Sequence, residues 1–577
     1  MSIASLRTCS IIGALLAVIA LGPLGSAATR GLGGPLFSIS PAGLRGPGGI
    51  GDMGTVFAAN PMTTEAAPSL PALPRVTIDT ALGPPPARVI KVSVGSDLQA
   101  ALNAARPGDA IELPAGTTFV GNFTLPHKPD AQWIVIRSSA YDRLPPPGSR
   151  ISPAQADLMA KIVSPNREPA ISTASGAHHY RFSGVEITTS SSVNVNLIRL
   201  EASGQTSLDR VPTDIIVDRC YIHGTPAGNI RRGIALNGAR LAVVDSYLSD
   251  FHERGADSQA IAGWNGPGPF KIVNNYLEGA GENVLFGGAD PAILNLVPSD
   301  IEVRRNHIVK PLAWHVGEAS FAGTPWNVKN LFELKNARRV LVEGNIFEQN
   351  WVHAQNGFAI LFTVRNQDGG SPWAVVEDVT FANNIVRHTA QGVNVLGQDD
   401  MRPSDHTKRI LIKNNLFDDV GAPRWGEGGK LFQLLGGAAD VVIEHNTAFQ
   451  TGTIVMAEGA PNLGFVFRYN IALHNAYGIL GTGTGVGNPT LERYFPNAIV
   501  TKNVIIGGTA LQYPVGNFFP ASVDQVGFAD YRKGDYHLAT SSPYARAAEG
   551  VDPGADLKAM RAALGALVQL SQSSSRP

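Results

Sequence analysis

The sequence predicts an all-β solenoid, a parallel β-helix with three strands in each coil. A short pattern returns through most of the chain, as in "RVLVEGNIF" (339–347) and "RILIKNNLF" (409–417): alternating apolar residues, two polar residues, usually an asparagine, and another apolar residue. The intervals between its copies contain no run long enough for the helices of ankyrin or leucine-rich repeats. Glycine (63 residues) and proline (40 residues) are spread along the chain, as in an all-β protein with many turns.

The asparagine position of the pattern gives the length of one coil. Its spacing runs from 24 to 39 residues, and each interval contains three short β-like runs. Stacked coils place equivalent residues about 4.8 Å apart, so asparagines at one position can hydrogen-bond to their copies above and below. We therefore assign them to the scaffold, with smaller substitutes at the start of the row. The row consists of Cys220, Ser246, Asn275, Asn306, Asn345, Asn384, Asn415, Asn446, Asn470 and Asn503.

The N-terminus has the features of an export signal. Arg7 precedes the apolar run 11–21, and small residues follow at 25–28. The 11 residues of that run are too few to span a bilayer. We expect residues 1–27 to be a signal peptide and the mature protein to be secreted into an extracellular or periplasmic space.

Three regions follow the signal peptide. Residues 28–86 are rich in Gly, Pro and Ala and predict a linker or a loosely attached extension. Residues 87–548 contain the repeat, and we expect about ten to twelve coils in one domain. At its start, a short amphipathic helix capped by Ser96 or Asp97 is expected to cover the open first coil. Residues 549–577 predict a helical tail, most simply a cap on the last coil.

The chain resembles the pectate-lyase-like superfamily of secreted right-handed parallel β-helix proteins over about residues 90–548. The likeness rests on the opening "DLQAALNAARPGDAIELPAG" (97–116), on the asparagine-bearing coils and on the late "DYHLATSSPYARAA" (535–548). It implies a right-handed solenoid that works on the outer face of the strands preceding the asparagine-bearing ones. It does not select a reaction, because the superfamily includes lyases, hydrolases, epimerases and phage tail proteins.

The charge balance bears on the choice of partner. The chain has 46 Lys and Arg residues against 47 Asp and Glu residues, which gives no footprint for nucleic acid or an anionic membrane surface. We expect a monomer without a membrane span whose partner is an acidic polysaccharide.

Strand alternation divides the residues of the expected working face into two groups. The inward group is Phe332, Leu334, Phe362, Val364, Val393 and Val395. The outward group is Glu333, Lys335, Thr363, Arg365, Asn394 and Gln433. The two longest intervals of the repeat, 39 residues each, flank these strands, so long loops are expected above the same zone.

Lys335, Arg365 and Glu333 are the candidate catalytic residues. β-Elimination from a uronic-acid polymer needs a neutralised carboxylate and a base that removes the α-proton. An arginine beside a lysine supplies both functions, and Glu333 can orient either group. A solvated salt-bridge patch is the plain alternative, but the sequence favours a polysaccharide lyase that acts on a uronic-acid polymer.

Further residues are candidates for binding substrate and calcium. Loop tryptophans suit stacking on sugar rings, although they can equally plug the solenoid wall. The substrate-binding candidates are Trp314, Trp326, Trp351, Trp373, Trp425, Asn394, Gln433 and His353. Asp368, Asp399 and Asp400, on neighbouring turns, are candidate ligands of Ca²⁺, the one cofactor expected, although such turns form without metal too.

Two other functions stay open. "NQDGG" (366–370) and "QDD" (398–400) vaguely resemble the acidic segments of polygalacturonase-like glycoside hydrolases, whose Gly-His-Gly and Arg-Ile-Lys segments have no counterpart here. The third possibility is a non-catalytic solenoid that binds glycans or forms part of a cell surface.

Overall fold

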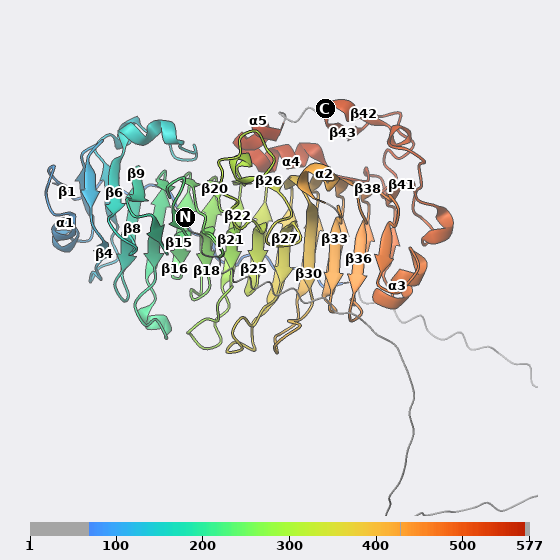
Figure 1. Cartoon of the computed structure of the whole chain (residues 1–577), viewed down its shortest axis with the longest axis horizontal. Helices are drawn as coiled ribbons and strands as arrows, with labels where there is room; N and C mark the ends of the chain where they lie inside the picture. Colours follow the sequence, from blue (N-terminus) through green and yellow to red (C-terminus); the bar gives the residue numbers. More distant parts are fainter. Residues whose placement is uncertain (1–67, 427, 572–577) are drawn as a thin grey trace, which may run out of the picture. The chain divides into compact units, whose positions relative to one another are not determined.

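Three long parallel sheets build the protein. The structure, a computed structural model, describes residues 68–426 and 428–571, all within the unit Ala66–Pro577. We name its 14-stranded sheet A, its 13-stranded sheet B and its 12-stranded sheet C. The chain visits sheets C, A and B in turn, and each strand pairs with its counterpart one coil away (Figure 1). The right-handed parallel β-helix predicted from the sequence is confirmed.

Sheet C holds the residues of the expected working face. Its strands are β4 (Phe123–Leu125), β7 (Ile171–Thr173), β11 (Ile198–Leu200), β15 (Arg232–Leu236), β18 (Gln259–Gly263), β21 (Glu282–Phe286), β24 (Asn330–Leu334), β27 (Phe358–Thr363), β30 (Gln391–Leu396), β33 (Phe432–Leu435), β36 (Val455–Glu458) and β39 (Ile479–Gly481). Sheet A runs from β1 (Arg88–Lys91) to β40 (Ile499–Thr501). Sheet B runs from β3 (Thr118–Val120) to β41 (Val504–Ile506).

The asparagines form one buried row at the turn between sheets A and B. Asn384 is typical: its Oδ1 accepts the backbone N–H of Asn345 at 2.9 Å and the side-chain Nδ2–H of Asn345 at 3.0 Å. The preceding residue, Asn383, has a left-handed backbone with φ of 58°, which turns the chain sharply out of its strand. The row therefore gives partners to backbone groups that this sharp, buried turn would otherwise leave unsatisfied.

The row continues at both ends with different residues. Near its start, Ser246 Oγ accepts the backbone N–H of Cys220 at 3.0 Å. At its end, Asn503 donates its backbone N–H to Oδ1 of Asn517 at 3.0 Å, and Asn517 lies outside the strands.

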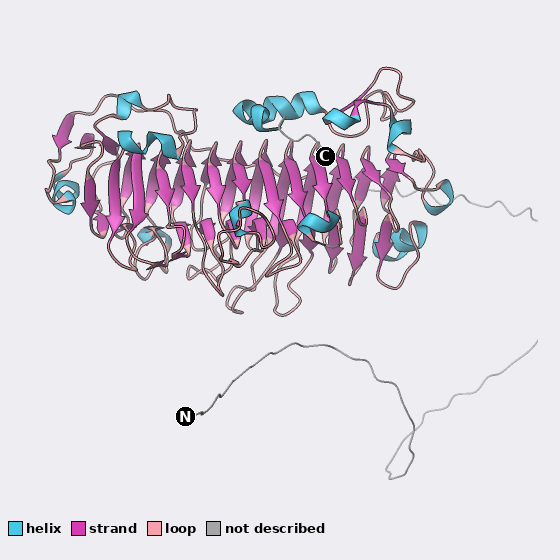
Figure 2. Cartoon of the chain, turned by 45° about the horizontal axis from the view of Figure 1, so that its top comes forward, coloured by secondary structure: helices cyan, strands magenta, loops and turns pink. Residues whose placement is uncertain are grey.

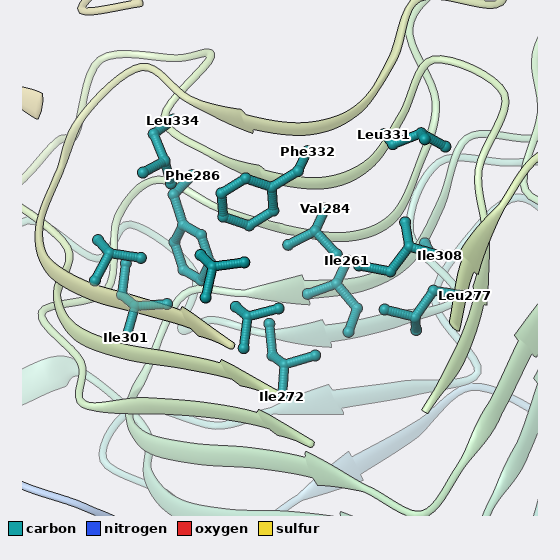
Figure 3. Packing of buried hydrophobic residues seen from close by; sticks show 14 of the residues in the cluster. Ile261, Ile272, Leu277, Val284, Phe286, Ile301, Ile308, Leu331, Phe332 and Leu334 are labelled. Carbon is teal, nitrogen blue, oxygen red and sulfur yellow. The ribbon is translucent and has the colours of Figure 1, made fainter. Parts of the chain in front are cut away.

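Inward side chains of all three sheets fill the interior. Figure 3 shows Val284 and Phe332 of sheet C in one cluster with Ile272 of sheet A and Leu277 of sheet B. The inward residues predicted for the working face all belong to this core and are at most 1% exposed: Phe332, Leu334, Phe362, Val364, Val393 and Val395. The alternation of the sequence therefore assigned the two faces of these strands correctly.

Helices close both ends of the solenoid. Helix α1 (Leu98–Ala104) covers the first coil as expected, and Asp97 caps it by accepting the N–H of Gln99 at 2.8 Å. Leu98 and Leu102 of this helix join the main core. At the other end, helix α3 (Asn488–Tyr494) buries Leu491 and Tyr494 in the same core.

The C-terminal helix does not cap the last coil, which corrects the expectation from the sequence. Helix α4 (Leu557–Leu564) lies over the middle of the solenoid (Figure 1), followed by α5 (Val568–Ser571). Its apolar side packs on Ile346, Ile385 and Leu416, which project from sheet B. Without the helix these three residues would form an exposed apolar stripe. The helix therefore packs at the place where it removes this apolar surface from water.

The final part of the predicted extension is attached to the solenoid. The backbone N–H of Ala72 donates to Asp378 Oδ1 at 3.0 Å, and Lys271 Nζ donates to the carbonyl of Ile78 at 2.9 Å. The Ile78 side chain is buried against Ile216 and Val244 of sheet A. The expected signal peptide and the extension up to residue 67 lie outside the described residues. None of the described helices is both long and apolar enough to cross a bilayer.

Candidate active site

The candidate site lies on the outer face of sheet C, beside long loops that gather at the middle of the solenoid (Figure 2). One outward residue from each strand stands in register: Glu333 pairs with Leu361, Leu361 with Asn394, and Asn394 with Gln433. Asn394 Nδ2–H donates to Gln433 Oε1 at 2.9 Å, so these two substrate-binding candidates are held together. The face is mixed apolar and polar, and its charge is concentrated around Glu333.

Glu333 is the centre of a hydrogen-bonded cluster. Although it projects outward, it is only 2% exposed. Its Oε2 accepts Asn330 Nδ2–H at 3.0 Å, and its Oε1 accepts the Thr363 hydroxyl at 3.4 Å. Lys335 Nζ lies 3.7 Å from Oε1, with 15% of the lysine side chain exposed. Glu333 is therefore fixed in place, and Lys335 is held loosely beside it with access to solvent.

Arg365 is brought next to Lys335 on the following coil. Its backbone N–H donates to the Lys335 carbonyl at 2.9 Å. Its guanidinium, however, is already balanced, because Nη1–H donates to Asp399 Oδ1 at 3.0 Å and also to Asp400. The Asp399 side chain is 3% exposed, whereas that of Asp400 is 66% exposed. The arginine thus has one buried partner and one that solvent reaches freely.

A column of polar residues at the start of the sheet C strands was not identified from the sequence. Arg232, Gln259, Glu282 and Asn330 occupy one register position on four consecutive coils. Arg232 Nε–H donates to Gln259 Oε1 at 2.7 Å, and Gln259 Nε2–H donates to Glu282 Oε2 at 2.7 Å. Each residue stands two positions before a large buried apolar residue of its strand, and that common offset was the available signal: these residues are Ile234, Ile261, Val284 and Phe332.

Glu282 is an unusual acid within this column. It is fully buried, and burial together with the neighbouring carboxylate of Glu333 raises its pKa to about 7. Lys329 Nζ approaches its Oε1 at 3.7 Å and is also paired with Asp257. A carboxyl group that titrates near neutrality can donate or accept a proton under ordinary conditions.

Lys310 fixes the turn that leads into Glu282. This lysine is completely buried, and its Nζ donates to the carbonyls of Gly279 at 2.7 Å, Ala280 at 2.9 Å and Gly281 at 3.1 Å. Burial lowers the pKa of its ammonium to about 7. Since these three carbonyls belong to the residues just before β21, the lysine determines where that strand and its first side chain begin.

Four of the five loop tryptophans are buried, which corrects their assignment as sugar platforms on sheet C. The exposed fractions are 5% for Trp314, 2% for Trp326, 3% for Trp351 and 3% for Trp425. The first three pack together with Val328, and Trp425 donates its Nε1–H to Asp419 at 2.8 Å. The loops fold these rings against the solenoid wall, where burial of their apolar area is favourable.

Two other candidates and one missed tryptophan have different surroundings. Trp373 is half-buried and donates Nε1–H to the carbonyl of Leu296 at 3.1 Å. His353 is exposed, and its Nδ1 accepts the backbone N–H of Val328 at 3.3 Å. Trp264, which the sequence reasoning did not select, lies under the guanidinium of Arg232 at 5.1 Å from its ring centre. It is the tryptophan that joins the polar column on sheet C.

The three aspartates predicted to bind calcium do not fit that ion. Asp399 and Asp400 both accept from the Arg365 guanidinium, so a cation already stands between them. Asp368 donates its backbone N–H to Asp290 Oδ2 at 3.2 Å. Calcium takes about six to eight oxygen ligands, and no group of three or more His, Cys, Asp or Glu within the described ranges is arranged for a metal ion.

Comparisons with known proteins identify the fold. No family model matches the sequence, and no curated protein matches it. Among solved structures, the PL6 family alginate lyase AlyGC is similar with a TM-score of 0.50 and 13% identity, over 85% of this chain and 59% of AlyGC. The chain thus spans less than two thirds of AlyGC. The likeness confirms the fold expected from the resemblance to the pectate-lyase-like superfamily.

Two further solved structures have lower scores. The polysaccharide lyase Pedsa3628 from Pseudopedobacter saltans has a TM-score of 0.41 and 12% identity, over 73% of this chain and 92% of its own. The pectate lyase Pel9A has a TM-score of 0.36 and 13% identity, over 59% and 78%.

Proposed function

We propose that this protein is an exported polysaccharide lyase that cleaves a uronic-acid-containing polymer by β-elimination on the outer face of sheet C. The observation that carries the proposal is the cluster of Glu333, Lys335 and Arg365 on adjacent coils, with the lysine and arginine joined through their backbones. The fold supports it, since AlyGC, which shares the fold, is an alginate lyase by name.

Lys335 is the proposed base. Its amine removes the proton next to the uronate carboxyl group, the freed electron pair forms a carbon–carbon double bond, and the bond to the neighbouring sugar oxygen breaks. Glu333, held by Asn330 and Thr363, orients the lysine without contacting the substrate. The leaving oxygen takes its proton from solvent.

Arg365 is the proposed partner of the substrate carboxylate. In the resting protein its charge is balanced by the exposed Asp400 and the buried Asp399. A substrate carboxylate replaces Asp400 at little cost, because an exposed ion pair is worth only about 0–1 kcal/mol. The arginine then stabilises the negative charge that develops as the proton leaves.

The test is a panel of pectate, alginate and glycosaminoglycans incubated with the protein and followed at about 235 nm, together with a reducing-end assay. A lyase creates an unsaturated, absorbing product. Hydrolysis would release reducing ends without this absorbance, and a binding protein would give neither signal.

Variants then test the residues. Lys335→Ala should lower the rate about 100-fold to 10,000-fold, the range for loss of a general base. Lys413→Ala, on the outer face of sheet A and paired with Glu444, is the matched control and should keep full activity. Activity that survives in both Lys335→Ala and Arg365→Ala would refute the assignment of these two catalytic residues, even if the protein is a lyase.

One observation favours a second candidate function, a glycoside hydrolase. Glu282 and Glu333 lie in the same charged cluster, and the pKa of Glu282 is raised to about 7, as suits a general acid. Reducing ends released without absorbance, and lost in Glu282→Gln, would support this reading against the lyase.

A further inference from the structure

A second concave region lies on a different face of the solenoid, against the outer side of sheet B. Its floor is formed by three consecutive strands, β13 (Tyr221–His223), β17 (Tyr247–Ser249) and β20 (Tyr276–Glu278). Because their first residues are in register, three tyrosine rings form a column. The rings of Tyr247 and Tyr276 stack with centroids 4.2 Å apart, and Tyr221 meets Tyr247 edge-on at 5.8 Å.

A cavity of about 370 Å³ lies over Tyr221 and Tyr247 of this column. The apolar part of its wall includes Pro153, Pro226, Trp314 and Trp326. Its volume falls in the lower part of the range of small-molecule pockets. Four of its lining residues carry hydroxyl groups: Tyr221, Tyr247, Ser249 and Thr324. Aromatic rings combined with hydroxyl groups suit a small, hydroxylated ring.

Two carboxyl groups, those of Asp250 and Glu278, also line the cavity. Glu278 is 7% exposed, its Oε1 accepts the Tyr276 hydroxyl at 2.7 Å, and its Oε2 accepts the backbone N–H of Asp250 at 3.2 Å. Neither carboxyl group has an ion-pair partner in the described part of the chain. Burial raises the pKa of both, that of Glu278 to about 7, and the charge of Asp250 adds to the shift of Glu278.

This arrangement favours a cation as the missing partner. A buried and a half-buried carboxyl group that form no ion pair are costly, and a cation between them removes that cost. Tyrosine and tryptophan rings also attract ammonium groups through their electron-rich faces. An anionic ligand is disfavoured by the same two acids, so the ligand differs in charge from the polymer proposed for sheet C.

We propose that this cavity binds a cationic amino sugar. The ammonium group lies between Asp250 and Glu278, while the rings of Tyr221 and Tyr247 and the hydroxyl groups contact the sugar ring. The inference stands apart from the proposed lyase activity, because it shares no residue with the sheet C site.

Three sugars of equal ring size test the proposal by calorimetric titration of the full-length protein at pH 7: glucosamine, glucose and glucuronate. Glucosamine should bind saturably. Glucose should bind at least about tenfold more weakly than glucosamine, and glucuronate should not bind. Equal affinity for glucosamine and glucose would overturn the proposal, and so would the absence of glucosamine binding.

Variants locate the site. Glu278→Gln and Asp250→Asn should each weaken glucosamine binding about tenfold or more, and a cooperative thermal unfolding transition checks that each variant is folded. Glu302→Gln, a 9% exposed glutamate on sheet A, is the matched control. Asp250 is only half-buried, so Asp250→Asn remains informative if Glu278→Gln fails to fold. Undiminished binding by folded Asp250→Asn protein would overturn the assignment of the ammonium site.

Discussion

The asparagine row inside the solenoid and the polar column on sheet C repeat with the same coils, yet they are built in opposite ways. The row places one residue type at nearly every coil, because each amide binds an identical amide on the next coil. The column places Arg232, Gln259, Glu282 and Asn330 at one register position. Identical residues at one position stabilise the stacking of coils. A position that stays in register but has a different residue on each coil can instead carry functional side chains.

Two asparagines of adjacent coils give the largest expected contrast. Asn384→Ala removes the acceptor of two buried donors of Asn345, each costing about 1–3 kcal/mol when unsatisfied. Asn394→Ala, on the outer face, should change the free energy of unfolding by about 0.5 kcal/mol or less. Denaturant unfolding of both variants measures the difference. Similar losses in the two would contradict the division into scaffold and surface.

Two buried glutamates should respond to pH in opposite directions. Arg387 and His307 lower the pKa of Glu348 to about 2 against the effect of burial, so its contribution is present above its unfolded pKa and is lost as pH falls toward 2. The pKa of Glu282 is raised to about 7, so the folded protein favours the protonated form of this carboxyl group. Its effect on the free energy of unfolding is most favourable below the unfolded pKa, and that advantage is lost as pH rises through 7.

Melting temperatures of two glutamine variants test these signs. Relative to the unchanged protein, Glu282→Gln should gain stability between pH 5 and pH 8, on the order of 1–3 kcal/mol. Glu348→Gln should show its largest deficit near neutral pH and approach the unchanged protein at low pH. Parallel curves for both variants would show that neither shift is linked to folding.

The smallest effect is expected from Asp400. Its side chain is 66% exposed, so Asp400→Asn should alter stability by less than about 1 kcal/mol. If Arg365 exchanges this carboxylate for that of the substrate, the variant should lower KM and leave kcat unchanged. A fall in kcat would instead make Asp400 part of the reaction.

The sequence identified the features that repeat from coil to coil, but not the site residues that differ between coils. Alternation identified the inward side chains, because Phe332 and Val393 obey the same two-residue period as every strand around them. The position of Glu282 was missed, since a column with a different residue on each coil leaves no repeated letter to find. Its contacts with Gln259 and Lys329 exist only once separate coils are stacked.

The conformation of the loops was the other feature that could not be predicted from the sequence. Trp326 and Trp351 lie in segments without a repeat, and their direction depends on packing with residues such as Val328. The sequence showed that aromatic rings gather near the middle coils, but it could not show whether they face solvent or the wall. The same holds for Arg365, whose partners Asp399 and Asp400 come from the next coil.

Asn517 has a consequence for how long such a molecule can grow. A stack of identical coils offers its last row of amides to any further coil, including one from another molecule, as fibrils do. Here Asn517 accepts the final N–H from Asn503 and turns its own amide back, donating to the carbonyls of Val500 at 2.9 Å and Pro514 at 3.0 Å. The last amide is thereby used within its own chain, and the solenoid ends as a discrete object rather than a template for polymerisation.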